Sequence, residues 1–159
     1  MYKPIVKVIE VPTDILTAYR LFSAGMGSWW PLDTRSISIH STGVAAKALE
    51  TDPVPGGAII EIASDDTRHV WGNFTDCDEP NSLAINFHMG QPLDHSTQLV
   101  VSFILMAPER TLVKLVHGGW DCFGALAPMM RDGYDKGWDE IFGFHYAHCC
   151  EKSRYLRRA

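Results

Sequence analysis

Between Val44 and His117 the sequence alternates between short apolar segments and tight turns, and this pattern restricts the fold more than any other feature. In one such segment Leu83, Ile85 and Phe87 alternate with smaller or more polar neighbours. A strand directs successive side chains to opposite faces, so each segment predicts a half-buried strand. Short strands joined by tight turns form an antiparallel meander and not a parallel sheet with crossover helices.

The same alternation sets approximate strand boundaries and faces. Val113, Leu115 and His117 share one face of the last strand, so His117 is predicted to point into the core. His88 falls on the opposite face of its strand from Phe87 and its apolar partners. The predicted strands span 4–11, 44–50, 58–63, 68–77, 83–87, 99–105 and 113–117.

One short helix is predicted near the N-terminus. The segment 12–14, Pro-Thr-Asp, offers side chains that can cap a helix, and apolar residues with helical spacing follow it as far as Ser23. Gly25 and Gly27 break this helix. A further short helical turn is expected to carry Trp29 and Trp30 before Pro31.

The C-terminal segment from Leu126 to Cys150 has a different period. Its larger side chains recur every three or four residues, which is the period of an α-helix, at Met130, Tyr134, Trp138, Ile141 and His145. A sheet with one apolar face needs a cover, and this helix is the predicted element long enough to supply it. The sequence therefore predicts an α+β fold in which an antiparallel sheet packs on a long C-terminal helix.

Two glycines interrupt the predicted C-terminal helix. Gly133 and Gly137 each cost about 1 kcal/mol relative to alanine inside a helix. This cost indicates a close approach, either to the sheet or to space kept for a ligand, and close packing is the favoured interpretation. Pro128 fits within the first helical turn, where the missing amide is not needed.

Length and charge exclude several classes of protein. The chain of 159 residues fits one domain, 1–159, and its formal net charge of -5 argues against nucleic acid, which requires a basic surface. No apolar run approaches the roughly 18 residues of a membrane span, and the N-terminus lacks a secretory signal. The four cysteines form no Cys-x-x-Cys pair, so free thiols and a cytoplasmic location are expected.

Several short motifs occur in an order that resembles the Hsp90-ATPase-activator-homologue branch of the START-like, or SRPBCC, superfamily. The similarity extends from about Pro4 to His148 and depends on the order of the motifs. They are Val11–Asp14 before a helix, Phe22, Met26-Gly27, Trp29–Asp33, Val70–Gly72, Leu83–His88, Leu115–Trp120, Arg131–Tyr134 and Gly137-Trp138.

This resemblance implies a helix-grip fold (START-like, Bet v 1-like), in which a curved antiparallel sheet surrounds a long C-terminal helix and leaves a cavity between them. Members of the superfamily bind lipids, sterols, hormones or polyketides, and some catalyse cyclisation or ring hydroxylation. The additional N-terminal domain of the eukaryotic Hsp90 co-chaperone has no counterpart in this sequence. Fold analogy alone does not assign a function.

The leading hypothesis is a protein that binds a small apolar or lipid-like molecule in this cavity, without a cofactor. Tryptophans combine a large apolar surface with one hydrogen-bond donor, a combination that suits a pocket wall. They are equally ordinary core residues, and both interpretations of Trp30 and Trp138 are open. The predicted ligand-binding residues are Trp30, Trp71, Phe87, Phe103, His117, Tyr134, Trp138 and Ile141.

Two other functions are open. A cyclase- or hydrolase-like enzyme could use His117 or Tyr134 as acid or base, although a structural role for His117 is favoured and no catalytic motif occurs. A protein-interaction module related to Hsp90 co-chaperones predicts an exposed apolar patch, and a homodimer is a further possibility. His145 and His148 have the spacing of two metal ligands, but a packing role is favoured and no metal site is predicted.

Overall fold

The computed structural model describes residues 2–158, with side chains described as far as residue 154. Seven strands form one antiparallel sheet in the order β1-β7-β6-β5-β4-β3-β2. This confirms the predicted meander. The strands are β1 (Ile5–Val11), β2 (Ala48–Thr51), β3 (Ala58–Ile62), β4 (Arg68–Asp78), β5 (Ser82–Phe87), β6 (Thr97–Ala107) and β7 (Arg110–Gly118).

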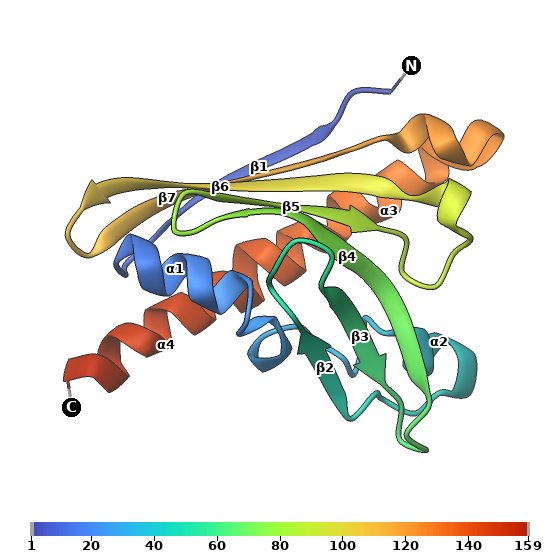
Figure 1. Ribbon diagram of the computed structural model, residues 1–159, viewed down its shortest axis with the longest axis horizontal. Coiled ribbons are helices and arrows are strands. Elements are labelled where there is room, and N and C mark those ends of the chain that lie inside the picture. The colour runs from blue at the N-terminus through green and yellow to red at the C-terminus, as the bar shows by residue number, and fades with distance from the viewer. Residues whose placement is uncertain (1, 159) are drawn as a thin grey trace.

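The helices gather on one side of this sheet, which bends round the C-terminal helix (Figure 1). Asp14 caps the first helix by accepting a hydrogen bond from the Thr17 amide at 3.0 Å, as the sequence predicted. The helices are α1 (Ile15–Phe22), α2 (Ile37–Thr42), α3 (Ala127–Glu140) and α4 (Ala147–Arg158), with the 3-10 turns η1 (Met26–Ser28), η2 (Leu93–His95) and η3 (Trp120–Leu126). The fold is thus the expected α+β helix-grip fold.

The long C-terminal helix contains one wider turn. Between α3 and α4 lies the π-helix η4 (Ile141–Tyr146), and the three run on as one helix across the sheet (Figure 1). Pro128 lies in the first turn of α3, as predicted. The wider turn advances the buried face, so Phe142 and Tyr146 are fully buried while His145 is only half-buried.

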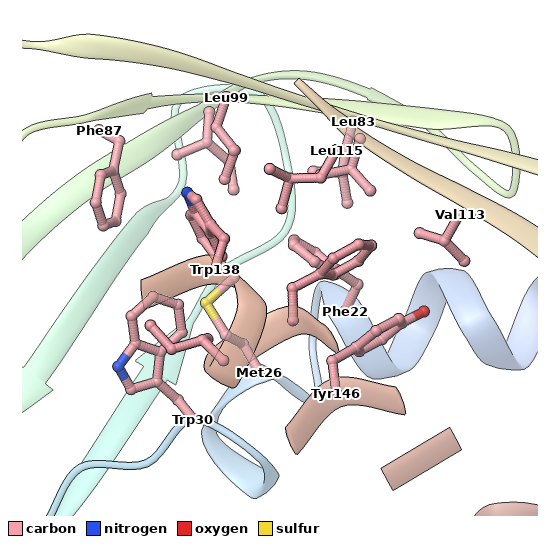
Figure 2. Close-up of a cluster of buried hydrophobic side chains, with 14 of the residues drawn as sticks. Phe22, Met26, Trp30, Leu83, Phe87, Leu99, Val113, Leu115, Trp138 and Tyr146 are labelled. Atoms are coloured by element: carbon pink, nitrogen blue, oxygen red, sulfur yellow. The ribbon is translucent and has the colours of Figure 1, made fainter. Parts of the chain in front are cut away.

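The core fills the space between the sheet and this helix. The register aligns Ile85, Leu99 and His117 across three neighbouring strands, and all three point inward. Trp138 rises from α3 toward these strands, and Figure 2 shows it among side chains that descend from the sheet. The alternation predicted the inner faces of β5, β6 and β7 correctly.

Three local expectations need correction. A helix, α2, occupies residues for which the sequence predicted no element, and β2 begins at Ala48 and not at Val44, which is exposed. The short turn after Gly25 ends at Ser28, before Trp29 and Trp30. All four cysteines are free, as expected.

Candidate functional site

Two adjoining hollows open beside the N-terminal half of α3. The first, of about 250 Å³, lies against the α3 glycines and is lined by Trp30, Arg35, His40, Met89, Met129, Met130, Gly133, Tyr134, Gly137 and Ile141. The second, of about 430 Å³, shares four of these residues and is lined by Ser36, Ile37, His40, Ser41, Met89, Gly90, Gln91, Met130 and Tyr134. We call the two together the α2–α3 cleft. Its volume is in the range of small-molecule sites.

The two glycines of α3 explain part of the cleft. A Cβ atom added at Gly133 would meet no atom within 4 Å, and one at Gly137 would lie 3.7 Å from Nη1 of Arg35. Neither glycine is therefore needed for close packing on the sheet, which was the favoured interpretation of the sequence. Gly133 borders open space, whereas Gly137 is buried beside Arg35 and Ile141. Both line the cleft, where the helix accepts their cost of about 1 kcal/mol each.

Arg35 reaches the cleft from the segment before α2. Its Nε donates to Oε2 of Glu140 at 3.1 Å, which ties this segment to the end of α3. Nε1 of Trp30 donates to the Arg35 carbonyl oxygen at 2.7 Å. These two bonds fix the wall that Trp30 and Arg35 form together.

The buried carboxylate of Glu61 anchors α2, the opposite wall. Glu61 lies on β3 and is 0% exposed. Its oxygens accept hydrogen bonds from the amides of Ile37 and Ser38 at 2.8 Å, from the Ser38 hydroxyl at 2.5 Å and from Nε1 of Trp71 at 2.9 Å. Burial alone would raise the pKa of Glu61, but these bonds outweigh it and hold the pKa below its usual value. Glu61 is thus a charged cap for α2.

Behind the cleft, His117 belongs to a closed hydrogen-bond network. Nε1 of Trp138 donates to its Nδ1 at 3.0 Å, and its Nε2 lies 2.7 Å from the Thr97 hydroxyl. That hydroxyl donates to the Phe87 carbonyl oxygen, so it accepts the proton of Nε2. His117 is therefore neutral, with both ring nitrogens engaged, and it is 0% exposed. This geometry supports the structural role and leaves no lone pair for acid–base chemistry.

The neutral state of His117 predicts a loss of stability in mild acid. Burial lowers the pKa of folded His117 to about 3, against an ordinary value of 6.5 in an unfolded chain. Between these values the unfolded chain binds a proton that the folded chain does not. As the pH is lowered through this window, the free energy of unfolding should therefore decrease, by up to about 1.4 kcal/mol per pH unit.

Urea unfolding over this pH range measures the slope, with His117→Gln as the variant. Glutamine keeps one donor and one acceptor but does not titrate, so the slope should become flatter. A slope that survives in His117→Gln would assign the effect to other groups.

The predicted ligand-binding residues occupy two layers. Trp30, Tyr134 and Ile141 line the cleft. Four others form the layer behind it. The ring centroid of Trp30 lies 4.8 Å from that of Trp71 and 5.7 Å from that of Trp138. The ring centroid of Tyr134 lies 5.2 Å from that of His117 and 6.0 Å from that of Phe87. Phe103 lies apart from this group, with its ring 5.2 Å from that of Tyr19.

The sequence analysis missed several of the residues that line the cleft. They are Arg35, His40, Met89, Met129 and Met130, and they come from three segments that no local motif connects. Methionine is a flexible, polarizable side chain that suits an adaptable binding surface. The hydroxyl of Tyr134 is directed at the sulfur of Met89, at 3.9 Å. Burial raises the pKa of Tyr134 to about 12, so this hydroxyl remains protonated at neutral pH.

A separate hollow of about 480 Å³ lies at the other half of the helix. It is lined by Leu21, Ser28, Trp29, His145, His148, Cys149, Lys152 and Ser153. His145 and His148 both border it, but residues 2–158 contain no group of three His, Cys, Asp or Glu side chains that could hold a metal ion. Likewise, no helix in that range is long and apolar enough to cross a membrane.

Comparison with solved structures places this architecture in a known class. The chain has the helix-grip fold. It is similar over 95% of its length to CalC, a self-sacrificing resistance protein of Micromonospora echinospora, with a TM-score of 0.67, 24% identity and 96% of that chain covered. No protein-family profile matches the sequence, and a search of curated proteins finds no match.

Two further structures share the fold. The anthrahydroquino-γ-pyrone synthase Txn09 is similar over 84% of this chain and 88% of its own, with a TM-score of 0.59 and 22% identity. An HSP90 activator of Plasmodium falciparum, PFC0360w, is similar over 89% of this chain and 97% of its own, with a TM-score of 0.54 and 16% identity. At such identities the likeness shows the fold and not the function.

Proposed function

We propose that this protein binds a small, largely apolar molecule in the α2–α3 cleft. The observation that carries the proposal is the pair of glycines at 133 and 137, which cost helix stability and line the cleft, with open space beside Gly133. Methionine and aromatic side chains surround that space, as in small-molecule sites. Two proteins of this fold support the proposal, since CalC is a self-sacrificing resistance protein and Txn09 an anthrahydroquino-γ-pyrone synthase.

In this proposal the predicted site residues have separate roles. Trp30, Tyr134 and Ile141 contact the ligand, while Trp71, Phe87, His117 and Trp138 hold the contact residues in place. Phe103 supports the more distant part of the core. A cytoplasmic location is part of the same proposal, because four free thiols suit a reducing compartment.

Native mass spectrometry of gently purified protein, together with a fluorescence titration, tests the proposal. The probe is phenylnaphthylamine, an uncharged dye whose emission rises in an apolar site. We expect saturable binding of one dye per chain, and a co-purified molecule would compete with it. An absence of both a bound species and saturable dye binding would contradict the proposal.

A second candidate function rests on the outer face of the sheet. Val6, Val116 and Val100 lie side by side across β1, β7 and β6, and Val6 and Val100 are 52% and 42% exposed. Such a row supports a protein-interaction module, and one protein of this fold is described as an HSP90 activator. A pull-down with Hsp90 tests it, with Val100→Lys expected to abolish capture. Undiminished capture by that variant would place any contact elsewhere.

A further inference from the structure

Arg35 is the charged side chain that lines the α2–α3 cleft, and none of the residues that border either hollow is Lys, Asp or Glu. The protein as a whole has the opposite balance, with 19 acidic and 14 basic residues other than histidine. The basic lining is therefore a local feature of the cleft and does not follow from composition.

Arg35 has hydrogen-bonding capacity that the protein does not use. Its guanidinium carries five N–H donors, and the described residues engage the one on Nε, through Glu140. The two terminal nitrogens have no protein partner among those residues. Nη1 lies near Gly137, where an added Cβ would be 3.7 Å away. Glu140 thus orients the guanidinium, which lies against Gly137 and lines the cleft.

The rest of the lining limits which acceptor group of a ligand could bind the unused donors of Arg35. The walls around Arg35 are Trp30, Ile141 and the methionines of α3, which offer an apolar surface and few further donors. A phosphate dianion is commonly held by several cations or by a series of backbone amides. A carboxylate needs fewer donors, because its two oxygens match the paired donors of one guanidinium.

We infer that the molecule bound in the α2–α3 cleft is an apolar carboxylic acid, whose carboxylate accepts hydrogen bonds from the terminal nitrogens of Arg35. Its apolar body lies against Trp30, Tyr134 and the methionines. This inference rests on the proposed function and adds the chemical class of the ligand. Arg35 determines the specificity for the acid, and Glu140 positions Arg35.

A competition assay with a matched pair of ligands tests the inference. Phenylnaphthylamine is the fluorescent reporter, and naphthylacetic acid and naphthylacetamide compete with it. These two competitors have the same body, and only the acid is charged. The acid should displace the dye at a concentration on the order of tenfold lower than the amide, because hydrogen bonds to charged groups are the stronger ones.

Variants assign the difference to one side chain. Arg35→Gln should remove the advantage of the acid while the affinities for the dye and the amide stay the same. The Trp30 bond survives this change because it is made to the backbone of residue 35. Arg20→Gln is the matched control, since Arg20 is also an exposed arginine paired with a glutamate, Glu79, and does not line the cleft. The control should retain the full preference.

The outcomes separate the inference from the proposed function. Dye binding with equal displacement by acid and amide would overturn the inference and leave the proposed function standing. A preference for the acid that survives in Arg35→Gln would also overturn it. If naphthyl phosphate competed better than naphthylacetic acid, the preferred ligand would be a phosphate and the inference of a carboxylic acid would be overturned. Failure of the dye to bind the unaltered protein, with no co-purified molecule in the cleft, would contradict the proposed function itself.

Discussion

Replacement of Glu61 by alanine is expected to lower the free energy of unfolding by about 3–5 kcal/mol, the loss that follows when one partner of a buried charged network is removed. The change leaves two backbone amides, a serine hydroxyl and the indole N–H of Trp71 without their acceptor. All four donors lie at the junction of α2 and the sheet. Helix α2 should therefore detach first, and the cleft should lose one wall.

Urea unfolding followed by tryptophan fluorescence measures the loss, and Glu50→Ala is the matched control. Glu50 lies on the adjacent strand β2 and pairs with Arg68 at the surface, where both side chains are more than half exposed. Its removal should change the free energy of unfolding by no more than about 0.5 kcal/mol. Equal effects of the two substitutions would show that Glu61 does not hold α2.

The second large effect concerns binding. Gly133→Phe should reduce the affinity for phenylnaphthylamine at least about tenfold, equivalent to about 1.4 kcal/mol. The new ring would enter open space in the cleft, because nothing lies within 4 Å of a Cβ at this position. The free energy of unfolding should stay level or rise by up to about 1 kcal/mol, since a helical glycine has been removed. Loss of binding without loss of stability is the expected signature.

Gly143→Phe is the matched control for this substitution. Gly143 is an exposed glycine of the same long helix and does not line the α2–α3 cleft. The control should bind the dye with unchanged affinity. If Gly133→Phe bound the dye as well as the control does, the dye would lie outside the cleft.

The sequence could predict most of the sheet because its signal is local. Strands β5 and β7 bury every second side chain, as does β6 as far as Phe103, so alternation alone assigned Leu99, Leu115 and His117 to the inside. Beyond Phe103 the alternation fails, because Leu105 is exposed. The resemblance to START-like proteins added the curvature of the sheet around the C-terminal helix. The inward position of His117 was correct for the same reason, although its neutral network also needs Trp138 from another element.

Helix α2 could not be predicted because its stability comes from a distant residue. The segment Ile37–Thr42 is rich in β-branched and hydroxyl side chains, which are weak helix formers. Ser36 caps the Ile39 amide locally, but the amides of Ile37 and Ser38 depend on Glu61, on a strand more than twenty residues away in sequence. The cleft was missed in part for the same reason, since α2 forms its second wall.

The C-terminal helix shows where periodicity is incomplete. A uniform helical period placed His145 on the packed face as a packing residue, and it is half-buried, but the period did not indicate Tyr146, which is fully buried after the wider turn at Ile141–Tyr146. The glycines at 133 and 137 were recognised as unusual, but a helical glycine is compatible both with space kept for a ligand and with close packing. Only the positions of neighbouring atoms distinguish them.

The central claim is that the α2–α3 cleft is the binding site, and methionine methyl NMR tests it most directly. The chain has six methionines, of which Met89, Met129 and Met130 line the cleft. Met26 is buried in the core and Met106 is exposed on β6, so they serve as internal references. Titration with phenylnaphthylamine should shift the three cleft methyl signals together, with one saturation curve, and leave Met106 unchanged. Saturable binding that leaves Met89, Met129 and Met130 unshifted would contradict the account.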